Sequence, residues 1–336
     1  MENKVLVTGS AGHLGEALMR AFRATERPAA GLDIKSSAFT DYVGSIVDRA
    51  LVKRCMRDVK TVIHTATLHK PHIATHAMRD FVETNIAGTL VLLEEAAAAG
   101  VECLLYTSTT SAFGDALSPA ANEPAAWITE DVTPIPKNIY GVTKLAAESL
   151  CELFFRKHRL PTLVLRTSRF FPEDDDDAAI RSRYETANLQ ANELLHRRTD
   201  IQDIVTAHLA ADTRLRDAGF RSDKGFRCYI ISAQTPFQRS DCAQLRSSAA
   251  EVVQRLFPES AALYAARQWT LFPSIDRVYD SSRAIRELGW QPRYDFQHVL
   301  DCLKKGVDFR SPLAREVGSK GYHSKVFAEG PYPVNR

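Results

Sequence analysis

The sequence predicts an α/β fold in which a doubly wound parallel sheet is joined by a second, smaller lobe toward the C-terminus. Through the first half of the chain, short apolar runs alternate with helical patterns, which is typical of βαβ units with helices on both faces of a parallel sheet. After residue 170 the pattern weakens, because an acidic run at 174–177 and repeated prolines divide the chain into short pieces. This change indicates the smaller lobe.

The apolar runs place the strands in order along the chain. Residues 4–8, 29–34, 61–65 and 102–107 are predicted strands, and 162–166 is a further strand after a helix that begins near Tyr140. Residues 201–211 and 228–232 predict a helix and a strand that return to the sheet. We therefore expect residues 1–170 with 201–235 to form the first lobe, and 171–200 with 236–336 the second. The tail at 311–336 is rich in Gly and Pro but keeps aromatic residues, which favours an ordered wrap over a disordered tail.

Composition and charge exclude several classes of protein. The 336 residues are 45% hydrophobic and 25% charged, which excludes disordered, collagen-like and coiled-coil chains. The formal net charge of +2 provides no overall field for nucleic acid or anionic lipid. The six cysteines include no CxxC pair, and no apolar run approaches about 18 residues. We therefore expect a cytoplasmic protein without a membrane span, which binds a small molecule rather than nucleic acid.

A glycine-rich turn follows the first strand, where Gly9, Gly12 and Gly15 accompany a helical pattern that begins at Leu14. Such glycines allow the backbone to approach a pyrophosphate, whose charge is met by free amides at the helix start. A plain tight turn is the alternative interpretation. The second strand ends near Asp33, about twenty residues further on, where a carboxylate accepts hydrogen bonds from an adenosine ribose and repels a 2′-phosphate. Asp33 predicts NAD rather than NADP, although the adjacent Lys35 weakens that preference.

Tyr140 and Lys144 are separated by one helical turn, so the phenol and the ammonium lie on one face of a helix. In that arrangement we expect Lys144 to lower the pKa of Tyr140 from about 10 toward neutrality, which makes the phenol a usable acid and base. Ser108, Thr109 and Thr110 follow the fourth strand, at the edge where sheets of this class place their sites. A hydroxyl there can polarise a carbinol or a carbonyl of the substrate.

Six motifs in this order resemble the extended short-chain dehydrogenase/reductase family, in the branch that contains NAD-dependent sugar epimerases and dehydratases. They are the glycine turn, the acidic Asp33, the strand end at 62–66, the segments 85–89 and 106–114, and the pair Tyr140 and Lys144. The segment 288–292 resembles the family's late turn in the substrate lobe. The resemblance covers nearly the whole chain and implies a Rossmann sheet with a smaller C-terminal α/β substrate-binding lobe.

The resemblance also implies roles for individual residues. Thr109 corresponds to the catalytic Ser or Thr, Tyr140 to the general base, and Lys144 to the residue that binds the nicotinamide ribose and tunes that base. NAD is the implied cofactor, and contacts with it are expected from Gly9, Ala11, Gly12, His13, Leu14, Gly15, Asp33, Ser45, Ile46, Thr65, Ala66, Asn85, Thr107, Tyr140 and Lys144. Substrate contacts are expected from His69, Ser108, Thr110, Arg169 and Arg198. The alternative for Arg198 is a surface pair of arginines with Arg197.

Several positions depart from the family's pattern. Thr110 and Ser111 stand where dehydratases have an Asp-Glu pair, so elimination of water lacks its proton-transfer groups. Arg169 replaces an Asn that faces the substrate, and it either binds a phosphate or carboxylate or pairs with a neighbouring acid. The four aspartates at 174–177 suggest a cationic substrate, a metal or, the interpretation we favour, a solvated loop. Ser45 stands where the family has an Asp beside the adenine.

Two further patterns bear on metals and on assembly. His69, His72 and His76 recur at helical spacing, but this chemistry needs no metal and we expect none at these residues. The helices at 85–99 and 140–157 are apolar on more than one face. One face meets the sheet and the family pairs the other across a twofold axis, so the resemblance implies a homodimer through these helices.

Three functions fit these observations. The first is NAD-dependent 4-epimerisation of a nucleotide sugar or similar polyol, which needs no acid or base beyond Tyr140. The second is net NAD-dependent oxidation of a free sugar, aminocyclitol or small polar alcohol, which Arg169 and the run at 174–177 favour. The third is a non-catalytic NAD-binding sensor, against which the intact Thr109, Tyr140 and Lys144 argue.

Overall fold

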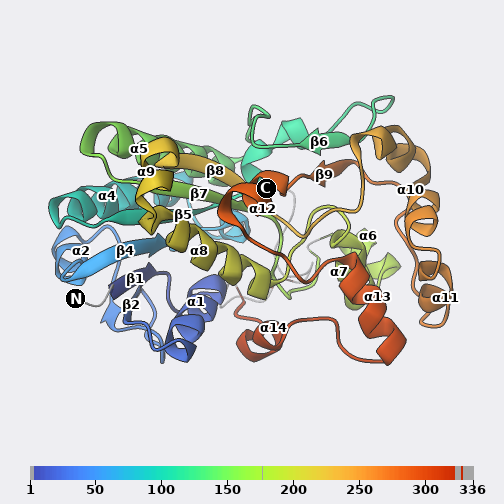
Figure 1. Cartoon of the computed structure of the whole chain (residues 1–336), viewed down its shortest axis with the longest axis horizontal. Coiled ribbons are helices and arrows are strands. Elements are labelled where there is room, and N and C mark those ends of the chain that lie inside the picture. Colours follow the sequence, from blue (N-terminus) through green and yellow to red (C-terminus); the bar gives the residue numbers. More distant parts are fainter. Residues whose placement is uncertain (1–3, 176, 322–326, 328–336) are drawn as a thin grey trace.

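The computed structural model describes residues 4–175, 177–321 and 327 (Figure 1). Within them, seven strands form a parallel sheet in the order β3-β2-β1-β4-β5-β7-β8. The strands are β1 (Lys4–Thr8), β2 (Ala29–Asp33), β3 (Tyr42–Val43), β4 (Val59–His64), β5 (Cys103–Thr109), β7 (Thr162–Thr167) and β8 (Phe226–Ile231). The order reverses between β1 and β4, so their carboxyl ends flank the crevice where such sheets bind ligands.

The predicted fold class is confirmed, and the predicted strands lie close to the observed ones. The interior strands are buried along most of their length, as expected for a parallel sheet that helices cover on both faces. The differences are at the ends: β4 begins two residues earlier than predicted, at Val59, and β5 continues to Thr109. Because β5 extends to Thr109, this residue is fixed by the sheet rather than by a loop.

Helices cover both faces of the sheet (Figure 1). One face packs against α1 (His13–Ala24), α8 (Ile201–Arg216), α12 (Ser282–Leu288) and α14 (Pro312–Val317). The other packs against α2 (Arg49–Cys55), α4 (Gly88–Ala98) and α5 (Ile139–His158). The side chain of Asn138 caps α5 by accepting a hydrogen bond from the amide of Gly141 at 3.1 Å, and Arg159 ends it in the left-handed conformation at φ 56°.

A second hydrophobic core lies beyond the carboxyl ends of the strands, on the right of Figure 1. It is built from α7 (Thr186–Glu193), α10 (Cys242–Leu256), α11 (Ser260–Ala265), α13 (Phe296–Lys305) and a two-stranded parallel sheet of β6 (Ala126–Ile128) and β9 (Arg277–Tyr279). The division into lobes remains our proposal. Within it, Leu288, Trp290 and Leu313 pack against the core of the first lobe, although the sequence places their segments in the second.

Short elements complete the described chain. They are α3 (Met78–Phe81), a π-helical turn η2 (Val82–Ala87), α6 (Ala178–Arg183), α9 (Ala218–Lys224), and the 3-10 turns η1 (Lys70–Ala74), η3 (Thr110–Phe113), η4 (Asp115–Leu117) and η5 (Arg239–Asp241). Of the tail expected to wrap the molecule, α14 packs on α1 and α8, and residues 322–326 and 328–336 lie outside the described part of the chain. In residues 4–175 and 177–321, we find no helix with the length and apolar character needed to cross a bilayer.

Candidate active site

The glycine turn after β1 brings backbone rather than side chains to the crevice. Gly9 has φ +74°, and a Cβ atom there would lie 2.8 Å from the amide nitrogen of Ala66. A Cβ atom on Gly15 would lie 1.9 Å from the carbonyl oxygen of Gly9, so only glycine allows α1 to start against this turn. The N-cap of α1, Gly12, has no side chain to cap the first amides. A helix start of this kind suits the pyrophosphate of a dinucleotide.

His13, the first residue of α1, adds a second observation that fits a dinucleotide. Its ring stacks on Phe170 with centroids 5.6 Å apart, and burial lowers its pKa to about 4, so it is neutral at pH 7. Both ring nitrogens are buried without a hydrogen-bond partner among the described residues. The ring lines a cavity together with Phe171, Gln190, Arg198 and Tyr294. The site therefore offers polar atoms that a bound molecule could satisfy.

Asp33 lies at the end of β2 and is fixed beside the glycine turn. Its Oδ2 accepts a hydrogen bond from the amide of Ala11 at 3.0 Å, and its Oδ1 accepts one from the amide of Lys35 at 2.8 Å. The carboxylate is thus oriented by backbone groups before any ligand arrives. This is the position in which a carboxylate receives the hydroxyls of an adenosine ribose.

Four further residues expected to contact the cofactor lie in the loops after β3 and β4. Ser45 and Ile46 lie after β3, where Ile46 is buried against Gly88 and the hydroxyl of Ser45 accepts from the amide of Val47 at 3.3 Å. Thr65 and Ala66 follow β4, and both hydrogen-bond to Thr8, at 2.7 Å and 3.3 Å. These contacts hold the loops after β3 and β4 at the crevice.

Asn85, which we expect to contact the cofactor, forms hydrogen bonds within the protein. Its side-chain amide donates to the hydroxyl of Thr143 and the carbonyl of Leu68, and its oxygen accepts from Thr67 and from the amide of Leu68. All four hydrogen-bonding positions are therefore used within the protein. Asn85 fixes the loop after β4 to α5, so its effect on a cofactor is indirect.

Thr109, Tyr140 and Lys144 meet at the carboxyl end of β5. The phenol of Tyr140 lies near Thr109, the last residue of the strand, closely enough for that side chain to act on its pKa. Lys144, one turn further along α5, donates from Nζ to the carbonyl oxygen of Thr107 at 2.7 Å. Its Nζ also lies 4.1 Å from the ring centroid of Tyr106. The structure therefore brings together the three residues that the sequence singled out.

The pKa of Tyr140 differs from the sequence-based expectation. Burial raises it to about 12, and the Thr109 side chain opposes that rise. The physical reason for the difference is that the ammonium of Lys144 faces the carbonyl of Thr107 and the ring of Tyr106 instead. Burial also lowers the pKa of Lys144 to about 7, and the carboxylate of Glu148 opposes this change.

His69 is the one expected substrate residue that lies beside Tyr140. Their ring centroids are 6.0 Å apart, and burial lowers the pKa of His69 to about 3, so its ring is neutral. Nδ1 of His72 accepts a hydrogen bond from the backbone amide of His69 at 2.8 Å, within the turn η1. In the part of the chain that the structure describes, no three His, Cys, Asp or Glu side chains are grouped to hold a metal ion.

Ser108 and Thr110, which we expect to contact the substrate, are buried and form hydrogen bonds within the protein. Ser108 is 3% exposed and donates to Oε1 of Glu148 at 2.5 Å. Thr110 is 5% exposed and donates to the carbonyl of Thr167 at 3.4 Å. The side chains of a strand alternate between its two faces, so Ser108 is directed away from its neighbour Thr109, whereas Thr110 begins the turn η3.

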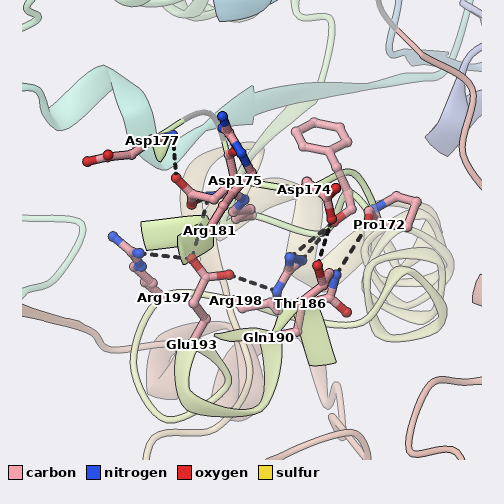
Figure 2. Close-up of polar contacts among 12 residues, drawn as sticks. Pro172, Asp174, Asp175, Asp177, Arg181, Thr186, Gln190, Glu193, Arg197 and Arg198 are labelled. Atoms are coloured by element: carbon pink, nitrogen blue, oxygen red, sulfur yellow. Dashed lines mark hydrogen bonds and ion pairs between the residues drawn. The ribbon is translucent and has the colours of Figure 1, made fainter. Parts of the chain in front are cut away.

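Arg169 and Arg198 pair with acids rather than standing ready for a substrate anion. Glu193 is fully buried, and its carboxylate lies 3.5 Å from Arg169 and 2.9 Å from both Arg197 and Arg198. Burial alone would raise the pKa of Glu193, but the three arginines lower it to about 2. Figure 2 shows Arg197 and Arg198 converging on Glu193. Of the two interpretations of Arg169, the structure favours the pairing with neighbouring acids.

Of the acidic run, the structure describes Asp174, Asp175 and Asp177, and Asp175 belongs to the same cluster. It is 6% exposed and accepts from Nη1 of Arg169 at 2.6 Å, so it is not part of a solvated loop. Asp174 accepts from the hydroxyl of Thr186 at 2.6 Å, and Asp177 caps α6 (Figure 2). Asp174 and Asp177 are exposed, as the interpretation of a solvated loop expects.

The sequence analysis did not identify Glu148 of α5 and Arg166 of β7, which form a buried ion pair one helical turn after Lys144. Nη2 of Arg166 lies 2.7 Å from Oε2 of Glu148, and Nε lies 3.1 Å from Oε1. The available signal was the spacing, since Glu148 follows Lys144 by one helical turn and therefore shares its face of α5.

Comparison with known proteins places these features in a family context. Residues 5–216 match the family described as the NAD dependent epimerase/dehydratase family. The chain is 26% identical to a UDP-glucose 4-epimerase of Azospirillum brasilense over 95% of both chains. It is 27% identical to a GDP-6-deoxy-D-mannose reductase of Pseudomonas aeruginosa, over 90% of this chain and 96% of that one.

Solved structures show the same fold. A short-chain dehydrogenase/reductase superfamily protein from Agrobacterium tumefaciens, with bound NAD, has a TM-score of 0.62 at 22% identity and covers 93% of this chain and 99% of its own. The UDP-N-acetylglucosamine 4-epimerase from Bacillus cereus has a TM-score of 0.59 at 20% identity, over 87% of this chain and 94% of its own.

Proposed function

The chain belongs to the NAD-dependent epimerase/dehydratase family, and from this premise we propose that it epimerises C4 of a nucleotide sugar. It is therefore an NAD-dependent enzyme, and the alternative of a non-catalytic sensor is set aside. The observation that carries the proposal is the meeting of Thr109, Tyr140 and Lys144 at the end of β5, followed by Thr110 and Ser111, which lack the acid and base needed to eliminate water. Epimerisation needs one proton-transfer group at the reacting carbon, whereas elimination of water needs more.

When bound, NAD supplies the acceptor for the carbinol hydride and later the donor that returns it. We propose that the hydroxyl of Thr109 holds the substrate oxygen while Tyr140 removes its proton and later gives it back. The ammonium of Lys144 would bind the ribose of the cofactor. Because Tyr140 is protonated at neutral pH when its pKa is about 12, its action as a base requires a nearby positive charge to lower that pKa.

The residues proposed to hold NAD are those at the carboxyl ends of β1 to β4. The first amides of α1 after Gly12 would receive the pyrophosphate, and Asp33 the adenosine ribose. The orphaned ring nitrogens of His13 support a polar ligand here. Ile46 would line the adenine side, and the loop that Asn85 fixes would border the nicotinamide side.

A net dehydrogenase acting on a free sugar, aminocyclitol or small polar alcohol is the second candidate. The pairing of Arg169 and Arg198 with Glu193 and Asp175 favours it, because a diphosphate would have to compete with carboxylates for these arginines. We also keep the proposal of a cytoplasmic location, which rests on the six cysteines that lack a CxxC pair.

The proposal is tested by denaturing the purified protein without added cofactor and measuring the nicotinamide released per chain. We expect close to one NAD per chain and interconversion of UDP-glucose and UDP-galactose, followed by NMR. In Tyr140→Phe the NAD content should persist while the rate falls by about 100-fold or more. An empty protein that reduces added NAD with free sugars or cyclitols would instead establish the dehydrogenase. Bound NADP, or an unchanged rate in Tyr140→Phe, would contradict the assignment of the site.

A further inference from the structure

Glu148 is a buried acid that the proposed reaction does not use. It lies on α5 one turn after Lys144 and is 8% exposed. Ser108 of β5 donates to Oε1 at 2.5 Å, and Arg166 of β7 contacts both carboxylate oxygens, at 3.1 Å and 2.7 Å. Three different elements therefore fix one carboxylate in place. A charge that is buried and held this firmly acts over a longer range than one in water.

The group on which the charge of Glu148 can act is the ammonium of Lys144, which lies one turn earlier on α5. Lys144 is 2% exposed, and its Nζ contacts the carbonyl oxygen of Thr107 and the ring face of Tyr106. From β4 and the loop after it, His64 and His69 face it as neutral rings, because burial lowers the pKa of each to about 3.

The remaining titratable groups near Lys144 lie on α5, β5 and β7. Burial raises the pKa of the Tyr106 and Tyr140 phenols and of the Cys151 thiol, so these three are uncharged at neutral pH. The cation of β7, Arg166, is engaged by Glu148. Among these neighbours, Glu148 is the acid that lies one helical turn from Lys144 on the same face of α5 and whose charge acts on the ammonium.

We propose that Glu148 is a positioning residue that keeps Lys144 in its ammonium form, while Ser108 and Arg166 hold the carboxylate in place one helical turn away. The inference rests on the proposed function, since it concerns the lysine proposed to bind the cofactor ribose. It gives a purpose to a buried ion pair that otherwise costs desolvation energy. It also gives a role to the hydrogen bond that Ser108 donates to Glu148.

The test measures the affinity of the protein for NADH, by the fluorescence of the bound nicotinamide, as a function of pH. The wild-type affinity should weaken as the pH rises through the pKa of Lys144, which is about 7. In Glu148→Gln the carboxylate no longer favours the ammonium, so the proton is lost at a lower pH. The midpoint of the transition should therefore move down by about one pH unit.

Asp212→Asn is the matched control. Like Glu148, Asp212 is a buried carboxylate in an ion pair, in this case with Arg27 and Arg216. It lies on α8, which covers the other face of the sheet. This variant should lose stability as Glu148→Gln does while keeping the wild-type midpoint. A shift of equal size in both variants would overturn the proposal, because it would reflect a general loosening of the fold.

Two further variants separate the possible failures. If Glu148→Gln does not fold, Glu148→Gln combined with Arg166→Met removes both charges of the buried pair and should show a smaller downward shift, because the loss of the cation partly offsets the loss of the carboxylate. Lys144→Met should abolish the transition. If it does not, the role of Lys144 in the proposed function is wrong. If it does, but the Glu148 variants keep the wild-type midpoint, only the present inference is wrong.

Discussion

At the scale of single residues, we propose that Asp33 decides which dinucleotide the crevice accepts. The amides of Ala11 and Lys35 fix its carboxylate, so its charge cannot turn away from a 2′-phosphate. We expect Asp33→Ser to weaken NAD binding and to raise the ratio of NADP to NAD affinity at least about tenfold, because the repulsion is removed and Lys35 remains nearby. Calorimetric titration with both dinucleotides measures the ratio. An unchanged ratio would show that the ribose lies elsewhere.

The same scale shows what the sequence could predict about the site. Thr109, Tyr140 and Lys144 were predictable because strand ends and helical spacing place them together. The pKa of Tyr140 was not, because it depends on burial by segments distant in the sequence. The pairing of Arg169 with Glu193 was unpredictable for a related reason, since nothing in the spacing of 24 residues indicates that α7 returns to this point.

At the scale of elements, Asp203 on α8 holds the turn that carries Trp290. Its carboxylate accepts from the amides of Arg293 and Tyr294 at 2.9 to 3.0 Å, and its backbone carbonyl accepts from the indole of Trp290 at 3.1 Å. Burial nevertheless raises the pKa of Asp203 from 3.8 to about 7, with the two amides opposing the rise. Asp203 therefore joins the turn after Trp290 to α8, and burial makes its carboxyl group costly to ionise.

This raised pKa gives a prediction with a definite sign. The folded state holds the proton of Asp203 more tightly than the unfolded state, so the stabilisation is complete below about pH 3.8 and is lost as the pH rises toward 7. The difference in free energy of unfolding between the wild type and Asp203→Asn should therefore decrease from pH 4 to pH 7. Urea unfolding of both proteins at each pH measures it. A difference that rises with pH would contradict the assignment.

The elements themselves were predictable where the pattern is local. The strands of the main sheet follow from apolar runs, and α5 follows from the cap Asn138 and the helical spacing after it. The pairing of β6 with β9 did not follow, because it joins segments about 150 residues apart and each strand has only three residues. Strands this short carry too little alternation to identify in a sequence.

At the scale of the whole molecule, the outer face of α5 and the neighbouring π-helical turn exposes apolar side chains. Val142 is 47% exposed and Leu153 38% exposed on α5, and Val82 is 44% exposed on η2, which packs against α5. A patch of this kind is costly to leave in water when it is continuous. We propose that it pairs with the same face of a second copy, as an isologous twofold interface.

Light scattering during size exclusion tests this assembly. The wild type should have a mass twice that of the 37.4 kDa chain, and the double variant Val142→Glu and Leu153→Glu should weaken the dimer by about 100-fold or more, because each copy would bury unpaired carboxylates. Val307→Glu is the matched control, since Val307 is 52% exposed but follows α13 in the second lobe, and it should stay dimeric. If the wild type is a monomer, the proposed twofold interface is wrong. Dissociation of both variants would place the interface elsewhere than on α5.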